Sequence, residues 1–189
     1  MSKNKVTFGL EKVHIAFVAE DGWETPVPIP GAVGWSPEPQ GESSTFYADN
    51  TAYFVVNSNN GYTGELEMAL IPDAILAEML GWEIDSNGAL IEISNAIPKK
   101  FALLGQVQGD AKNRRFVYYD CLASRPSKEL TTKGESVEVT ADTLSVTISP
   151  IDIDGKMIVK ADMELSDTNA TAFNGFFGAV YTPTAGGGA

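Results

Sequence analysis

The feature that most constrains the fold of this chain is a strict alternation of apolar and polar residues in three segments. Residues 62–70 read YTGELEMAL, residues 143–149 read TLSVTIS, and residues 157–165 read MIVKADMEL. Successive side chains of a β-strand point to opposite faces, so this period of two predicts strands with one buried and one solvated face. The second and third segments are expected to form a hairpin across a turn at 152–155.

The remaining pattern predicts further strands and two helices. Residues 6–18 are expected to form the first strand, and residues 101–108 and 114–123 a pair of strands rich in β-branched and aromatic residues. The segment IPDAILAEMLG at 71–81 predicts a helix, with Pro72 in its first turn and Gly81 as its C-terminal cap. A second, short helix is expected within 166–181, where Ser166 or Asp167 is a candidate cap.

These elements predict a mainly β fold. We expect a β-sandwich or barrel-like core, with the first helix packed outside the sheet and a short C-terminal helix. Residues 1–182 are expected to form a single domain, since 189 residues is the size of one ordinary domain. Residues 183–189, which include AGGGA, are expected to be a flexible glycine-rich tail.

The stretch at 34–60 has no clean core pattern and is much longer than the usual connection of about 4–6 residues. It is therefore predicted to be a long extended arm. Four of its aromatic residues are Phe46, Tyr47, Tyr53 and Phe54. Burying each such ring stabilises by about 1.5–3 kcal/mol, so the rings are expected to be covered. Either the arm folds back on its own sheet, or it docks on another subunit.

The charge of the chain is negative and unevenly distributed. A net charge of −12 argues against a surface that grips a nucleic-acid backbone. Residues 99–133 carry eight bases and three acids, whereas the segments on either side are acidic. This basic segment is either a solvated hairpin surface or a contact with the acidic parts of another copy. Its candidate contact residues are Arg114, Arg115, Arg125, Lys128 and Lys133.

Catalytic patterns fail when they are tested one by one. His14 is the only histidine and Cys121 the only cysteine, and both are expected to have structural roles. IDIDGK at 151–156 departs from a calcium loop and is read as a turn. Glu65 and Glu67 are neighbours on one strand face rather than a pair across a groove. We therefore predict an interaction protein rather than an enzyme, with no catalytic, cofactor or metal site.

The sequence also bears on location. The N-terminus, MSKNKVTF, lacks the apolar core of a secretory signal, and no stretch approaches the roughly 20 apolar residues of a membrane span. Synthesis and folding in the cytoplasm, without membrane binding by this chain, are expected.

Several segments resemble a known family. These are FGLEKVH, IPGAV, FYADNTAYFVVNSNNGYTGELEMALIPD, KKFALL, CLASRPS and TTKGESVEVTADTLSVTISP, in this order along nearly the whole chain. They are similar to the major tail protein, or tail tube protein, of long-tailed phages that infect Gram-positive bacteria. The blocks FYAD, SNNGYTGELE and ASRPS are not generic strand sequence.

The resemblance implies a structural virion protein made in the host cytoplasm. Six copies would close into a ring, and rings would stack into a hollow tube around the tape measure protein. The partners implied are further copies of the chain, the tape measure protein, and the tail terminator and distal tail proteins. Double-stranded DNA would pass through the tube into the host without specific binding.

The alternation then indicates which residues face the lumen. A ring can also continue the sheet of one subunit into the next. The candidate lumen-facing residues are Glu65, Glu67, Thr143, Ser145, Thr147, Lys160, Asp162 and Glu164. Two alternatives remain: a tube component of a phage-derived bacterial injection device, and a monomeric ligand-binding β-domain that uses the arm as a binding loop.

Overall fold

The computed structural model describes residues 9–48, 51–109, 112–128 and 141–184. The fold is mainly β, as expected, with one large antiparallel sheet and two helices in this part of the chain. The strands of the large sheet are β1 (Leu10–Ala19), β2 (Gly22–Trp23), β3 (Val27–Pro28), β4 (Ala32–Gln40), β7 (Gly61–Met68), β10 (Phe101–Val107), β11 (Arg115–Ala123), β12 (Asp142–Ser149) and β15 (Lys160–Met163).

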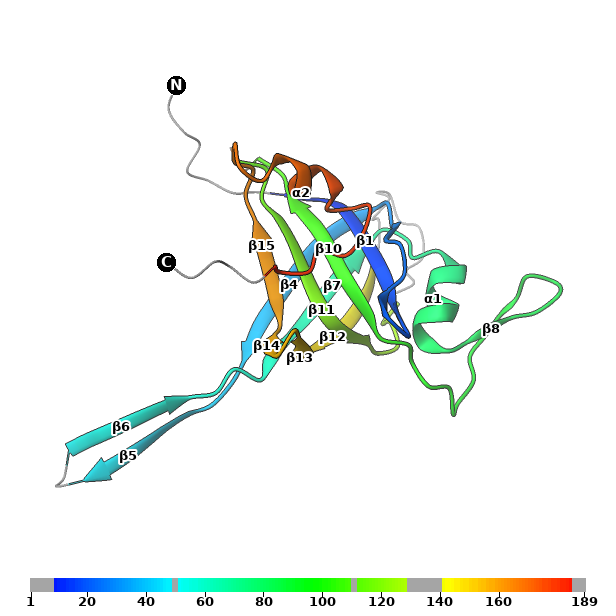
Figure 1. Cartoon of the computed structure of the whole chain (residues 1–189). Coiled ribbons are helices and arrows are strands. Elements are labelled where there is room, and N and C mark those ends of the chain that lie inside the picture. The colour runs from blue at the N-terminus through cyan, green and yellow to red at the C-terminus, as the bar shows by residue number, and fades with distance from the viewer. Residues whose placement is uncertain (1–8, 49–50, 110–111, 129–140, 185–189) are drawn as a thin grey trace, which may run out of the picture.

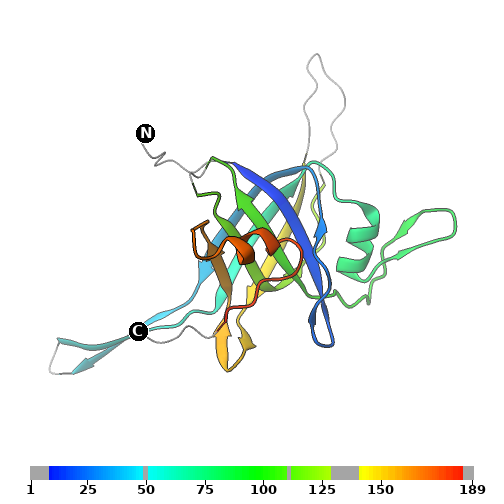
Figure 2. The same ribbon diagram turned by 45° about the horizontal axis from the view of Figure 1, so that its top comes forward.

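The sheet curls towards a barrel. Its strand order is β2-β1-β10-β11-β12-β7-β4, with β3 paired to β1 and β15 paired to β11. β4, at one end of this order, comes back into contact with β1 near the other end. Figures 1 and 2 show the resulting curved body, with the helices on its outside.

The inside of the curl holds the larger hydrophobic core, which we call the inner core. Leu66, Met68, Leu144, Val146 and Ile148 point into it from β7 and β12, in agreement with the predicted alternation. Helix α1 (Asp73–Leu80) closes one side, because Leu76, Met79 and Leu80 are buried in the same core. The helix ends at Gly81, whose φ of 69° is the left-handed conformation expected of a C-terminal cap.

A smaller outer core lies on the opposite face of β1, β10 and β11. It contains Ala16, Ala102, Leu104, Val117, Tyr119, Met163, Phe173 and Phe176. Helix α2 (Ala170–Gly175) covers this face (Figure 2). The helix is shorter than the predicted span, and the expected cap at Ser166 or Asp167 is wrong. Asn169 holds the cap position, and its side chain is already bonded to the Ser166 N–H and the Glu164 carbonyl.

The hairpin predicted between residues 143–149 and 157–165 is wrong. Both segments pair with β11 instead: β12 along Asp120–Ala123, and β15 along Arg115–Tyr118. The turn does form, but it joins only the short strands β13 (Ile151–Ile153) and β14 (Lys156–Ile158). β11 is long enough to hold two partners on one edge, so cross-strand pairs with β11 replace those of the predicted hairpin.

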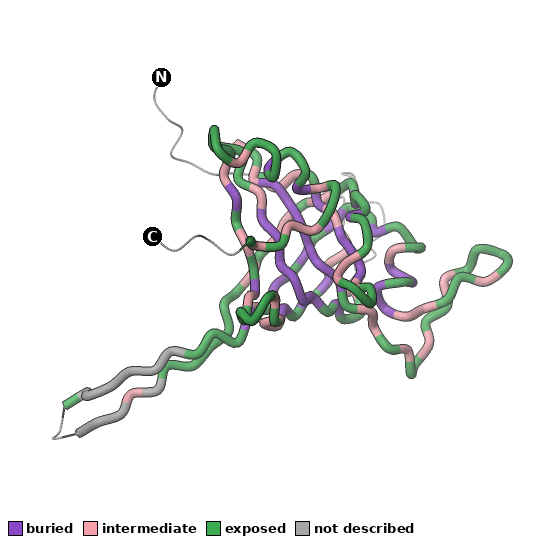
Figure 3. The backbone as a smooth tube through the Cα atoms, in the orientation of Figure 1, coloured by how far each residue is buried: buried purple, intermediate pink, exposed green. Residues whose placement is uncertain are grey.

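The remaining strands form two protruding hairpins. β5 (Ser43–Ala48) pairs with β6 (Thr51–Asn57), and β8 (Glu83–Ile84) pairs with β9 (Leu90–Ile91). Figures 1 and 3 show them at opposite ends of the body. Residues 34–40 of the predicted arm belong to β4 in the sheet, so only about 43–57 leaves it. Pro37 and Pro39 hid this strand in the sequence, although an edge strand tolerates proline.

Gly64 gives a test of the close packing between β4 and β7. A Cβ at this position would lie 2.7 Å from the Trp35 ring and 3.1 Å from the Pro37 backbone. Gly64→Ala is therefore expected to lower the free energy of unfolding by about 1–3 kcal/mol, measured by denaturant titration. Gly34→Ala on the paired strand is the control, because its Cβ would only touch the Glu67 side chain at 3.4 Å. Equal losses for the two variants would contradict this account of the packing.

Candidate assembly surfaces

The outer face of β12, β7 and β4 is polar. The ladders place Glu67 between Thr143 and Gly34, and Glu65 between Ser145 and Ser36. A third row places Thr63 between Thr147 and Glu38. These three rows contain three carboxylates and no base, and we call them the acidic face. A shallow depression of about 240 Å³ lies on this face beside Ser36, Glu65 and Ser145.

Five of the eight candidate lumen residues therefore share one face: Glu65, Glu67, Thr143, Ser145 and Thr147. Sequence reasoning missed Ser36, Glu38 and Thr63 on the same face. The available signal was a short alternation of Ser36 and Glu38 with Trp35 and Pro37, which the prolines obscured. In the structure, Trp35 and Pro37 are the less exposed residues of the four.

The other three candidates lie on β15 and the loop after it. Lys160 and Asp162 are in register with Tyr118 and Phe116, whose side chains belong to the inner core. They therefore point to the opposite side from the acidic face. Lys160 forms an ion pair of 2.9 Å with Asp162, and its ammonium lies 5.9 Å from the centre of the Tyr118 ring.

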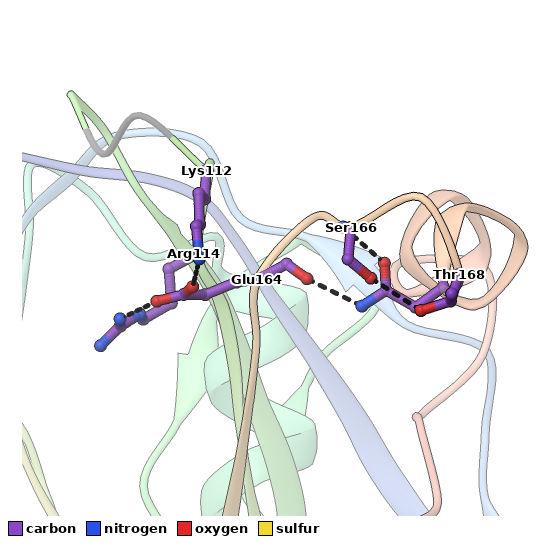
Figure 4. Close-up of polar contacts among 6 residues, drawn as sticks. Lys112, Arg114, Glu164, Ser166 and Thr168 are labelled. Carbon is purple, nitrogen blue, oxygen red and sulfur yellow. Dashed lines mark hydrogen bonds and ion pairs between the residues drawn. The ribbon is translucent and has the colours of Figure 1, made fainter. Parts of the chain in front are cut away.

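Glu164 forms a junction between two loops (Figure 4). Its carboxylate accepts from Lys112 at 2.6 Å and from Arg114, and its carbonyl accepts from the Asn169 side chain. Ser166 and Thr168 continue this network through their hydroxyls. The bonds from Lys112 and Arg114 hold the pKa of the Glu164 carboxyl below its usual range. This residue is engaged within its own chain.

The candidate basic residues do not form one patch. Arg114 is paired with Glu164, Arg125 with Glu92 at 2.9 Å, and Lys128 with Asp142 at 3.5 Å. Lys133 lies outside the described residues. Because these cations already meet acids of their own chain, their charge is partly neutralised before any neighbour arrives.

Arg115 has a structural role under the C-terminal segment. Its guanidinium lies 3.8 Å from the centre of the Phe173 ring and 4.7 Å from that of Phe177. It also donates to the Gln106 side chain at 2.9 Å and to the Phe173 carbonyl. His14 stacks on the other aromatic ring, Phe177, at 4.5 Å. This cluster ties α2 to β1, β10 and β11.

The arm is a hairpin that extends the main ladder beyond the body. β4 leads into β5 and β6 leads back into β7, and the pairing continues between them through the Ser58 N–H to the Glu42 carbonyl and the Asn60 N–H to the Gln40 carbonyl. Phe46 lies opposite Phe54 in the register, and a bulge follows at Tyr47. At about 3.3 Å per residue the hairpin reaches about 20 Å. Its backbone leads away from the sheet of its own chain (Figure 1).

Reactive side chains are not gathered into a site in the described part of the chain. Cys121 is fully buried, and burial raises the pKa of its thiol. The Nδ1 atom of His14 lies 2.9 Å from the Lys12 carbonyl. Among the described residues, no three His, Cys, Asp or Glu side chains are placed to hold a metal ion. The helices described there are too short to cross a membrane.

Comparisons with known proteins give distant likenesses. No family model and no curated protein matches the chain. One similar solved structure is the cap that terminates the tube of the anti-feeding prophage, at 7% identity and a TM-score of 0.48, over 87% of this chain and 97% of that chain. Another is from the baseplate of the same prophage, at 11% identity and a TM-score of 0.45, over 87% and 98%. Likenesses of this size assign neither a family nor a function.

The Arg115 cluster yields a prediction about the C-terminal segment. Arg115→Leu removes the cation between the two rings, a contact that stabilises by about 0.5–2 kcal/mol. Amide exchange across residues 170–181 is expected to become roughly 2–30-fold faster, measured by hydrogen–deuterium exchange. Lys156→Leu removes a charge from an exposed strand and serves as the control. If both variants exchange alike, Arg115 does not hold this segment.

Proposed function

We propose that this chain is the structural subunit of a phage tail tube. In this proposal it assembles into stacked hexameric rings around a tape measure protein and gives the genome a conduit into the host. The sequence resemblance supplies the identity of the assembly. The observation that carries the proposal is the acidic face, a bare polar sheet surface backed by a complete core, from whose strands the arm projects.

The acidic face is the proposed lining of the lumen. Glu38, Glu65 and Glu67 would repel the phosphate backbone of DNA. The Ser and Thr residues between them are uncharged, so these rows offer no cation to which the phosphates could bind. Lys160, Asp162 and Glu164 are left out of this lining, because they point elsewhere or bind residues of their own chain.

The arm is the proposed joint between copies. Its backbone leads away from its own sheet, so a neighbour is the available cover for its aromatic residues. Four such rings together represent about 6–12 kcal/mol of burial, comparable to the stability of a whole domain. Once assembled, terminator and distal tail proteins would end the tube.

Two alternatives remain in competition. A tube component of a phage-derived injection device would share the fold and the assembly, and the neighbouring genes separate it from a tail protein. A monomeric ligand-binding domain would not assemble at all. Negative-stain microscopy of concentrated protein distinguishes assembly from its absence: hollow tubes or six-fold rings support the proposal, and monodisperse small particles oppose it.

The arm gives a sharper test. The double variant Tyr53→Ser, Phe54→Ser is expected to leave a folded monomer that builds no tubes, checked by circular dichroism, sedimentation and microscopy. Met157→Ser removes a side chain that is 67% exposed on the separate β13–β14 hairpin, outside the arm, and should assemble normally. Normal tubes from the double variant would show that the arm is not the joint.

The lumen assignment is tested with tubes that have already formed. A density map is expected to place Glu65 and Glu67 on the inner wall. Glu65→Lys, Glu67→Lys tubes should retain short duplex DNA at low salt, because the repulsion becomes attraction. Glu20→Lys, Asp21→Lys makes the same charge change in the turn between β1 and β2, outside the acidic face. Equal retention of DNA by the two variants, or a map that places both glutamates on the outer wall, would contradict the assignment of the acidic face to the lumen.

A further inference from the structure

The strand β15 has one paired edge and one free edge. In the part of the chain that the structure describes, β15 pairs with β11 alone, along Arg115–Tyr118. Figure 1 shows β15 at one margin of the curved body. An unpaired edge presents a row of N–H and C=O groups that can pair with a strand of another chain. The residues of β15 therefore decide whether another chain can join the sheet here.

The hydrogen bonds show which residues of β15 face the free edge. The Tyr119 N–H donates to the Val159 carbonyl at 3.2 Å. Alternate residues of an antiparallel strand direct their backbone groups to the same neighbour, so Val159 and Ala161 face β11. Lys160 and Asp162 therefore direct their N–H and C=O groups to the free edge. Neither residue is a proline, so the backbone of this edge is able to pair.

The side chains of the same two residues reverse the pattern of the sheet. Lys160 and Asp162 are in register with Tyr118 and Phe116, so they point to the side of the inner core. β7 and β12 present aliphatic side chains to this core. The apolar residues of β15 belong to the outer core instead. β15 thus carries two charges on its core side, next to the free edge.

The two charges are held in place by their surroundings. The Lys160 ammonium lies 2.9 Å from the Asp162 carboxylate and 5.9 Å from the ring centres of both Tyr62 and Tyr118. These contacts favour an ammonium that stays on the core side. The Lys160 and Asp162 side chains are 35% and 39% exposed, so water still reaches both. The ion pair is therefore fixed in direction and still solvated.

We infer that the Lys160–Asp162 pair prevents the addition of a strand to the free edge of β15. An added strand would lie about 4.7–4.9 Å away, and its core-facing side chains would displace water from both charges. The desolvation of an ion pair can cost more than its attraction returns. Natural sheets protect free edges with short strands and with inward-pointing charges, and β15, with four residues, has both. The inference concerns a single copy and does not depend on the proposed function.

Replacing both charges with valine tests the block. Lys160→Val, Asp162→Val makes the core side of the edge apolar and keeps its N–H groups, so this variant is expected to associate through β15. In the unaltered protein two of the four amides of residues 160–163 lack a ladder bond and should exchange fast. In the associated variant all four should exchange slowly, measured by hydrogen–deuterium exchange and, for size, by sedimentation velocity. Lys156→Val, Asp167→Val removes the same two charges from exposed positions outside β15 and is the control.

A proline separates edge pairing from general adhesion of apolar side chains. The Asp162 N–H faces the free edge, so Asp162→Pro removes a donor from this edge and none from the ladder with β11. Lys160→Val, Asp162→Pro has no charge on the core side, as in the double valine variant. It is nevertheless expected to associate no more than the unaltered protein. Circular dichroism and thermal unfolding check that each variant is folded.

One outcome needs no variant. The Lys160 and Asp162 amides of the unaltered protein should exchange fast at every concentration and in any assembly that it forms, and slow exchange there overturns the block. A double valine variant that associates no more than the control also overturns it. Association of the proline variant shows that apolar side chains, not the edge, cause the effect, and contradicts the inference. Absence of tubes contradicts the proposed function and leaves this inference standing.

Discussion

The structure depends on β11, a strand whose two faces and two edges are all occupied. Phe116 and Tyr118 point into the inner core, and Val117 and Tyr119 into the outer core. One edge pairs with β10, and the other is divided between β15 and β12. A substitution that disrupts β11 would therefore perturb both cores and three neighbouring strands. A strand in a sheet with one solvated face has two neighbouring strands and contacts a single core.

This central position explains why the outer surface of the sheet has two different halves. Over β1, β10 and β11 the outer face is apolar and must be covered, and α2 with the segment up to Tyr181 covers it. Over β12, β7 and β4 the residues that point to the outer face are Ser, Thr and Glu, so this face can be solvated. The chain thus has a body with two packed cores and one broad polar surface, the surface that we propose as the lining of a conduit.

The sequence reveals elements whose signal is local and misses pairings decided elsewhere in the chain. The alternation in β7 and β12 and the cap at Gly81 each depend on a few neighbouring residues, and these predictions are confirmed. The pairing of residues 157–165 depended instead on the free edge of distant β11, which no local pattern shows. For the same reason, the candidate lumen set mixed residues of two faces, and the basic set mixed cations that the fold pairs with acids far along the chain.

The free edge of β4 limits how copies can join. Alternate residues of a strand direct their backbone groups to the same neighbour, and the Gln40 carbonyl faces the β7 side, where it accepts from Asn60. Pro37 and Pro39 therefore face the other edge, where they offer carbonyls but no N–H groups. A neighbouring strand could not complete a regular ladder there, so the sheet of one copy does not simply continue into the next at β4. In the proposed assembly, a contact at this edge would therefore use side chains, and the arm that continues from this same strand carries aromatic residues in its sequence.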